Sequence, residues 1–320
     1  MAQHPASALP AATATALTGA LRLTGDGPDG WFTGPWHDTT LADGTCVMRR
    51  RTLLRTPGSA SVWRRSTADT VLFFHTGTPA AVVTSGPGAT DTTVLGADAA
   101  AGQVAQCTVP AGIWHALAPL AEESLLWSEA SVPGDAEWQT AEPARLPDPV
   151  APAADVRAPR ASGTTAELLG MTAHVEGGYF RELYSSAGTV RTPVGTRLFA
   201  NTIHYLLDSR SPVGHLHGNV SDITHFLHSG GPITYLMLAP DGRLEKQVLG
   251  WDADRGQVPV FTCPGGWWKT SFLPEGVSEG LISEIVTPGF DFADQRMATA
   301  QDLVHASPDD ARRLAPYLSH

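Results

Sequence analysis

The 320-residue sequence has few charges, few cysteines and no long basic or apolar run. Charged residues make up 17% of the chain, and the net charge of −11 argues against nucleic acid and anionic membrane surfaces as partners. The cysteines, Cys46, Cys107 and Cys263, are odd in number and far apart, so they form no disulfide framework and are typical of a reducing cytoplasm. No apolar run is long enough for a membrane span.

The length and the composition favour a folded protein with two domains. Hydrophobic residues make up 42% of the chain, which is typical of a globular protein. Residues 1–15 are rich in alanine and threonine and lack the basic start of a signal peptide, so we expect a disordered N-terminus on a cytoplasmic protein. Residues 140–163 are rich in proline and alanine without a hydrophobic period, which indicates a linker.

The segments on the two sides of this linker resemble each other. V-P-A-G-I-W-H (109–115) matches C-P-G-G-W-W-K (263–269), and S-E-A-S-V-P-G (128–134) matches S-E-I-V-T-P-G (283–289). Two weaker matches lie upstream in the same order, at residues 28–32 with 175–180 and 75–79 with 228–232. This pattern predicts a tandem duplication, with one domain at 16–139 and its copy at 164–320.

Each copy has the pattern of an all-β domain. Short runs rich in β-branched or aromatic residues alternate with turn residues, and Asp241-Gly242 has the chemistry of a hairpin turn. Short helices are expected only near 164–170 and 307–317. Many short antiparallel strands in about 150 residues predict a jelly-roll or small barrel that encloses a pocket. The predicted strands include Val71–Phe74, Ala80–Thr84, Thr202–Leu207, Ile233–Leu238 and Leu281–Val286.

A histidine-rich stretch in the second copy is the strongest functional signal. His215 and His217 are two residues apart, so on an extended strand both rings point to one face, and Asp222 and His225 follow within reach of a hairpin. Imidazole and carboxylate groups are common ligands of zinc, iron, manganese and nickel. The alternative is that these residues are polar groups at a barrel mouth, bonded to backbone and solvent.

Several motifs resemble the cupin superfamily, and in particular its Cupin_5 family. The resemblance lies in H-V-E-G-G-Y-F-R-E (174–182), S-D-I-T-H-F (221–226), P-G-G-W-W (264–268) and T-P-G-F-D-F-A-D (287–294). It covers residues 165–305 well and residues 25–138 in eroded form. It implies a bicupin made of two tandem double-stranded β-helix (jelly-roll) barrels, in a family whose activities are mostly unassigned.

The resemblance also implies a ligand set for a divalent metal (Fe, Mn, Zn or Ni), and it implies no nucleotide cofactor. Metal-binding cupins use H-x-H, an acid and a later histidine, which correspond to His215, His217 and Asp222. Lys269 stands at the position of the later histidine, so His225 or His204 would have to replace that ligand. We expect His225 to point inward, because its neighbours by twos, Ile223 and Leu227, are apolar.

The first copy lacks the H-x-H motif. Arg64 stands at the family's histidine position, although His115 of the second motif is retained. We therefore expect the first barrel to bind no metal and to serve as a structural partner of the second barrel. The chain would then be an internal pseudo-dimer. A homodimer is a further arrangement that is typical of cupins. The functional alternative is an anion pocket at Arg64 and Arg65.

The remaining candidate residues lie around the predicted barrel mouth. Lys269, His204 and Glu176 are candidates for acid–base catalysis, although His204 also fits a structural role in a strand, and Glu176 fits a turn. Candidates for substrate binding are aromatic or polar, and the tryptophans fit core packing equally well. They are Tyr179, Arg181, Trp267, Trp268 and His228.

Three hypotheses of function follow for the second barrel. The first is a cupin enzyme that transforms a small organic metabolite with help from a metal, by oxygenation, lyase chemistry or isomerisation. The alanine- and proline-rich composition is typical of bacterial genomes in which such proteins serve specialised metabolism. The second is an isomerase, epimerase or cyclase without metal, in which a histidine and Lys269 act as acid and base. The third is a module that binds a small molecule without catalysis.

Overall fold

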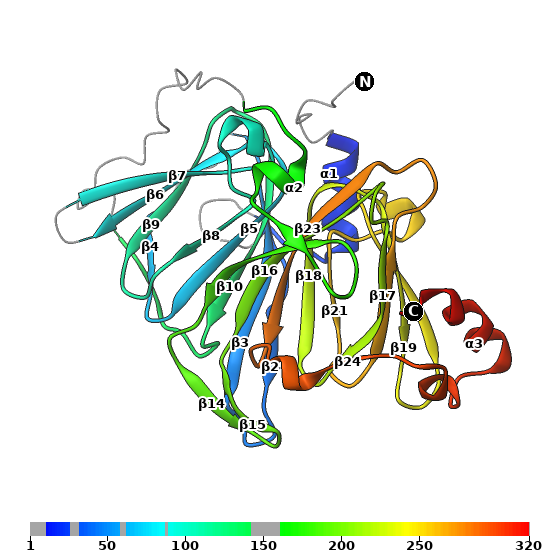
Figure 1. The fold of residues 1–320 in the computed structure, drawn as a ribbon. Coiled ribbons are helices and arrows are strands. Elements are labelled where there is room, and N and C mark those ends of the chain that lie inside the picture. The colour runs from blue at the N-terminus through cyan, green and yellow to red at the C-terminus, as the bar shows by residue number, and fades with distance from the viewer. Residues whose placement is uncertain (1–10, 26–31, 58–61, 87–88, 142–160, 320) are drawn as a thin grey trace. The chain divides into compact units, whose positions relative to one another are not determined.

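The computed structural model describes residues 11–25, 32–57, 62–86, 89–141 and 161–319, in two compact units, Met1–Leu168 and Leu169–His320 (Figure 1). Most of the predicted linker, residues 142–160, and the first ten residues of the predicted disordered terminus lie outside the described part. Helix α1 (Ala11–Ala20) includes the last five residues of that terminus. No helix among the described residues is long and apolar enough to span a membrane.

The first unit is built from two antiparallel sheets with a cluster of apolar side chains that includes Leu53, Leu72, Leu117 and Trp127. A turn at Ala99–Ala101 and the short α2 (Thr165–Leu168) accompany the strands. One sheet has the order β1 (Phe32–Thr33), β3 (Cys46–Arg55), β10 (Leu125–Val132), β5 (Asp69–Gly77), β8 (Gln106–Val109), with β2 (His37–Thr40) beside β3. The other has the order β11 (Trp138–Thr140), β4 (Arg64–Ser66), β9 (Trp114–Pro119), β6 (Ala80–Gly86), β7 (Ala89–Leu95).

The second unit has the same two-sheet plan and an added hairpin of β14 (Thr189–Thr192) and β15 (Gly195–Leu198). The first sheet has the order β12 (Thr172–Ala173), β13 (Tyr179–Ser185), β16 (Asn201–Asp208), β23 (Glu279–Thr287), β18 (Asp222–Gly230), β21 (Val260–Cys263). The second has the order β20 (Leu244–Leu249), β19 (Ile233–Leu238), β22 (Trp268–Phe272), β17 (Val213–Asn219), β24 (Gln295–Met297).

Strand β19 shows why the second unit needs a helix on its outer surface. Successive side chains of a strand point to opposite faces, and in β19 both faces are apolar. Tyr235 and Met237 join the core between the sheets, whereas Leu236 and Leu238 join a second cluster with Leu314. Leu314 belongs to α3 (Pro308–Leu314), which Ser307 caps by accepting a hydrogen bond from the Asp310 backbone N–H at 3.1 Å.

Matching details in the two units confirm the predicted duplication. The path β3-β10-β5-β8 corresponds to β16-β23-β18-β21. Asp98 caps a short turn that ends at Gly102 with φ of 75°, and Asp252 caps its counterpart, which ends at Gly256 with φ of 73°. All five predicted strands, the hairpin turn and both short helices are present. The chain is therefore all-β, with two jelly-roll barrels in tandem.

Charged side chains occupy part of the interior of the first barrel. Glu129 on β10 is fully buried, and its carboxylate lies 2.8 Å from both Arg64 Nη2 and Arg51 Nε. Burial alone would raise the pKa of Glu129, but the two guanidinium groups outweigh it and lower that pKa to about 2. Arg65 donates to Gln139 and stacks on Trp114. The carboxylate of Glu129 thus already neutralises Arg64, one of the two arginines of the predicted anion pocket.

We expect Glu129→Gln to destabilise the protein, because it leaves two arginines without their buried counter-charge. The cost is about 3 kcal/mol at pH 7, measured as a loss of the urea midpoint against the exposed control Glu137→Gln. The native pKa of Glu129 is depressed, so its contribution is present above the ordinary value of 4.5 and is lost as the pH falls towards about 2. A stability difference between wild type and Glu129→Gln that stays constant across this window would contradict the ion pair.

Candidate functional site

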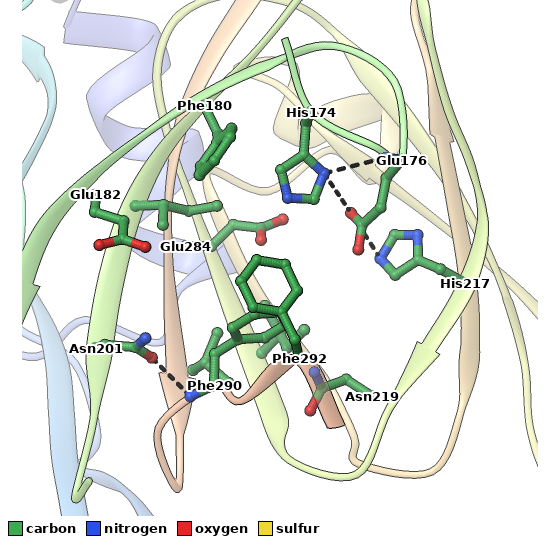
Figure 2. A pocket seen from close by; sticks show the side chains of 13 residues that line it. His174, Glu176, Phe180, Glu182, Asn201, His217, Asn219, Glu284, Phe290 and Phe292 are labelled. Atoms are coloured by element: carbon green, nitrogen blue, oxygen red, sulfur yellow. Dashed lines mark hydrogen bonds and ion pairs between the residues drawn. The ribbon is translucent and has the colours of Figure 1, made fainter. Parts of the chain in front are cut away.

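The second barrel contains a cavity that is open to solvent (Figure 2). Its empty space, with the open solvent at its mouth included, is about 570 Å³. Its wall combines apolar side chains with a set of polar groups that converge from both sheets and from the V-E-G-G-Y turn. The lining residues are His174, Glu176, Phe180, Glu182, Asn201, Ile203, His217, Asn219, Ile223, Glu284, Val286, Phe290 and Phe292.

One row of the sheet brings four of the site residues into line across neighbouring strands. Glu182 pairs with Ile203, Ile203 with Glu284, and Glu284 with His225, from β13 through β16 and β23 to β18. Side chains in one such row project from the same face of the sheet. The expected inward orientation of His225 is confirmed, since its ring stacks on core residue Phe261 at a centroid distance of 4.7 Å.

Lys269 on β22 places a buried cation at the inner side of this row. Its Nζ lies 2.8 Å from His225 Nε2 and 3.1 Å from Glu284 Oε1. Burial would raise the pKa of Glu284, but the Lys269 ammonium and then His225 outweigh it and hold that pKa far below the ordinary value. Burial first and Lys269 second also lower the pKa of His225 to about 4. Glu284 is therefore a permanent carboxylate, and His225 is a neutral ring.

Glu176 and His217 form a second pair, on the opposite side of the cavity from Glu182 (Figure 2). His217 Nδ1 lies 2.7 Å from the His215 carbonyl, which can only accept, so Nδ1 carries the ring hydrogen. His217 Nε2 is thus an acceptor, and it lies 3.2 Å from Glu176 Oε2. Two acceptors at this distance require a proton between them.

The pKa values of this pair place that proton on Glu176. Burial raises the pKa of Glu176 above its ordinary value, whereas burial and then Lys269 lower the pKa of His217 to about 3. The other oxygen, Oε1, accepts a hydrogen bond from Gln295 Nε2. Of the two groups, Glu176 is therefore the one that binds the shared proton more strongly, and it faces a neutral imidazole.

The V-E-G-G-Y turn fixes Glu176 and His174. Gly177 has φ of 93°, and a Cβ at this position would lie 2.2 Å from the Val213 carbonyl oxygen, so glycine is required. The Glu176 backbone N–H donates to His174 Nδ1 at 3.2 Å. His174 Nε2 therefore carries the hydrogen, and Figure 2 shows this nitrogen on the cavity side of the ring.

The four predicted metal ligands do not converge. A β-bulge between Gly214 and His217 breaks the alternation that would have put His215 and His217 on one face. Asp222 Oδ1 instead accepts from the Gly265 backbone N–H at 2.8 Å and holds the P-G-G-W-W turn. Within the described ranges, no group of three or more His, Cys, Asp or Glu side chains is arranged to hold a metal ion.

The two groups beside Lys269 do not suit a divalent metal ion either. The lone pair of His225 Nε2 accepts from Lys269, and the same ammonium lies beside Glu284. A divalent ion bound at His225 or Glu284 would lie next to a buried positive charge, which costs free energy in a medium of low dielectric constant.

His204 and His228 lie on the face of the sheet opposite the cavity row. His204 is directly paired with Ser283, one residue from the inward Glu284. Ser283 Oγ lies 3.0 Å from His204 Nδ1 and 2.8 Å from His228 Nε2. The predicted catalytic role of His204 and binding role of His228 therefore do not belong to this cavity. His228 lies three residues after the inward His225, so the alternation of side chains along β18 places it on the other face.

The remaining candidates also lie outside the cavity wall. Arg181 donates to the Leu169 carbonyl at 2.8 Å, and Arg210 stacks on Tyr179. Trp267 packs against the core under Arg243, and Trp268 joins the outer cluster under Arg296. Of the proposed catalytic residues, the structure brings Glu176 to the cavity and Lys269 directly behind it.

Most residues that line the cavity were not among the predicted site residues. Glu284 is the acid of the S-E pair that both repeats share. Its partner Lys269 lies on β22, 15 residues away along the chain and in the other sheet. His174, Glu182, Phe290 and Phe292 lie inside strings that carried the family resemblance, without a pattern that marked them as neighbours. Asn201 and Asn219 lie outside those strings.

Comparisons with known proteins agree with this architecture. Residues 19–138 and 164–298 match Cupin_5, described as "Cupin superfamily (DUF985)". The uncharacterized protein YML079W of Saccharomyces cerevisiae is 38% identical over 158 residues, which cover 44% of this chain and 78% of that protein. Vicilin from Solanum melongena, 12% identical, superposes with a TM-score of 0.52 over 87% of this chain and 84% of its own.

A variant of oxalate decarboxylase from B. subtilis is 13% identical and has a TM-score of 0.50 over 93% of this chain and 84% of its own. At such low identities the two solved structures show a shared fold and nothing of a shared reaction.

We expect Asp222→Ala to act on stability and not on the cavity. The substitution removes a charge-assisted hydrogen bond to Gly265 and should cost about 1.5 kcal/mol, measured by urea unfolding against the exposed control Asp254→Ala. The imidazole NMR signals of His217 and His225 should keep their positions. Displacement of both sets of signals would instead indicate that Asp222 shares a site with the two histidines.

Proposed function

The chain belongs to the Cupin_5 family, and we propose that its second barrel is a metal-independent acid–base site that isomerises or epimerises a small organic molecule. The observation that carries this proposal is a pair of carboxyl groups in one cavity with opposite partners, because Glu176 faces the acceptor Nε2 of His217 whereas Glu284 faces the Lys269 ammonium group. Burial raises the pKa of Glu176, whereas Lys269 outweighs burial and lowers the pKa of Glu284. Two titratable groups whose environments drive their pKa values apart are the usual mark of an acid and a base.

Glu176 is the general acid of this proposal. The V-E-G-G-Y turn and the contacts with His217 and Gln295 hold the carboxyl group of Glu176 in one orientation, in which it can present a proton. A substrate carbonyl oxygen that displaces the contact with His217 would receive this proton. The neutral Nε2 of His217 can then accept a hydrogen bond from the hydroxyl group that this protonation creates, and the same hydroxyl group returns the proton to Glu176 at the end of the reaction.

Glu284 is the base, and its low pKa limits which protons it can remove. Such a weak base abstracts a proton only from an acidified C–H bond, such as one next to a carbonyl group whose oxygen is being protonated. In this step the C–H electron pair becomes the C=C bond of an enol, the proton moves to Glu284, and the carbonyl oxygen gains the proton of Glu176. If the carbon next to the carbonyl group carries a hydroxyl group, Glu284 returns its proton to the former carbonyl carbon while that hydroxyl group gives its proton to Glu176, which yields the isomer. If the proton instead returns to the original carbon on its other face and the enol oxygen gives its proton to Glu176, the product is the epimer, and both carboxyl groups are restored in either case.

Lys269 holds the charges of the site and does not transfer the proton. It faces His225 and Glu284, and its two contacts orient the carboxylate towards the cavity. It also keeps His217 neutral, because its positive charge lowers the pKa of that ring. The proposal thus develops the metal-free hypothesis with a changed role for Lys269.

Hydrogen exchange tests the reaction without knowledge of the natural substrate. Small ketones (hydroxyacetone, aminoacetone and phenylacetone) are incubated in D2O with protein dialysed against EDTA, and NMR follows deuterium incorporation next to the carbonyl. We expect exchange above the buffer rate for at least one ketone. Glu176→Gln and Glu284→Gln should each reduce it by about 10²–10⁴, whereas the exposed control Glu275→Gln retains it.

Two results would refute the proposal. One is exchange that disappears with EDTA and returns with a divalent metal. The other is exchange that both carboxyl variants retain at the wild-type rate.

A further inference from the structure

The charges around the cavity restrict what can bind there. Three of its lining residues, Glu176, Glu182 and Glu284, carry carboxyl groups, and none of the lining residues, all within the described part of the chain, is a lysine or an arginine. Lys269 lies behind the wall, and its charge is taken up by Glu284. A carboxylate or phosphate ligand would meet negative charge here without a guanidinium or ammonium partner.

Glu182 supplies a negative charge at the outer end of the cavity. The residue is exposed, and no described side chain makes an ion pair or hydrogen bond with its carboxylate. It lies in the same row as Glu284, two strands away, which corresponds to about 10 Å between the two backbones. Figure 2 shows Glu182 on the side of the cavity away from His217.

Aromatic rings line the space between the two ends. Phe290 and Phe292 meet edge to face at a centroid distance of 5.0 Å, and Phe180 lies across the cavity from them (Figure 2). The faces of such rings attract organic cations. A carboxylate together with several phenylalanine rings is a suitable environment for an ammonium group.

The inner end offers hydrogen-bond donors. Asn219 is only 7% exposed, and its Nδ2 has no hydrogen-bond partner among the described residues, whereas its Oδ1 accepts from the Ser221 backbone N–H. His174 Nε2–H and the carboxyl proton of Glu176 are the other two donors. A buried amide without a partner is costly, so a ligand acceptor placed here gains the hydrogen bond that the fold leaves unmade.

We infer that the cavity binds a small amino-carbonyl compound, with its ammonium group at Glu182 and its carbonyl oxygen at Asn219 and His174. The inference rests on the proposed function in that it names a substrate class for the same cavity. The carbonyl end is the one that Glu176 protonates, and the ammonium group at Glu182 fixes the orientation of the substrate.

Three probes that share one phenyl ring test the ammonium end: 2-phenylethylamine, 2-phenylethanol and phenylacetate. Their dissociation constants are measured by NMR titration of the full-length protein, through the His174 and His217 ring signals. The amine should bind about tenfold more tightly than the alcohol, from one partly exposed ion pair and one cation–π contact, and phenylacetate should bind most weakly. Glu182→Gln should abolish the preference for the amine and leave alcohol binding unchanged, whereas Glu275→Gln should change neither.

A fourth probe, 1-[4-(2-aminoethyl)phenyl]ethanone, carries a carbonyl group on the opposite side of the phenyl ring from the amine and tests the inner end. It should bind about fivefold more tightly than 2-phenylethylamine, and Asn219→Leu should remove this gain. Phenylacetate binding as tightly as the amine, or a preference for the amine that survives Glu182→Gln, would overturn the inference. These are equilibrium measurements, so they are independent of whether Glu176 and Glu284 exchange protons with a substrate.

Discussion

A buried ammonium group beside a buried carboxylate is the constraint on which the second barrel depends. Lys269 and Glu284 are both shielded from water, and neither charge would be tolerated there alone. Their pairing fixes the charge of Glu284, and burial together with the positive charge of Lys269 lowers the pKa of His217 and of His225. It also places a positive charge where the family resemblance implies a metal-ligating histidine. The chemistry available to the cavity therefore follows from one residue on β22.

The two barrels solve the same electrostatic problem in different ways. Glu129 and Glu284 occupy matching positions on β10 and β23, and each needs a cation. In the first barrel Arg64 on β4 and Arg51 on β3 supply the positive charge. Arg64 pairs with His115 across the strands as His217 pairs with Lys269 in the second barrel, so Arg64 holds the position of His217. In the second barrel the cation comes from β22, so the smaller His217 faces the cavity that Glu176 and His174 also line. After the duplication, the two barrels thus diverged in the strands that supply the positive charge beside this glutamate.

The sequence predicted the strands, the duplication and the family, because alternating patterns and repeated strings are local signals. It also located Glu176 and Lys269, and it predicted the inward orientation of His225. It did not predict the bulge in β17 that separates His215 from His217, or the bond to Gly265 that occupies Asp222, since both depend on strand pairing. The contact between Glu284 and Lys269 joins two sheets that face each other. The spacing of residues along the chain does not reveal such a contact.

A double-mutant cycle on Lys269 and Glu284 tests the central ion pair most directly. Free energies of unfolding are measured for Lys269→Met, Glu284→Gln and the double variant, with the exposed Lys246→Met as control. If the pair exists, each single variant loses about 3 kcal/mol and the double variant loses less than the sum, because it leaves no unpaired charge. Losses that simply add, or a Lys269→Met variant as stable as Lys246→Met, would contradict a buried Lys269–Glu284 pair.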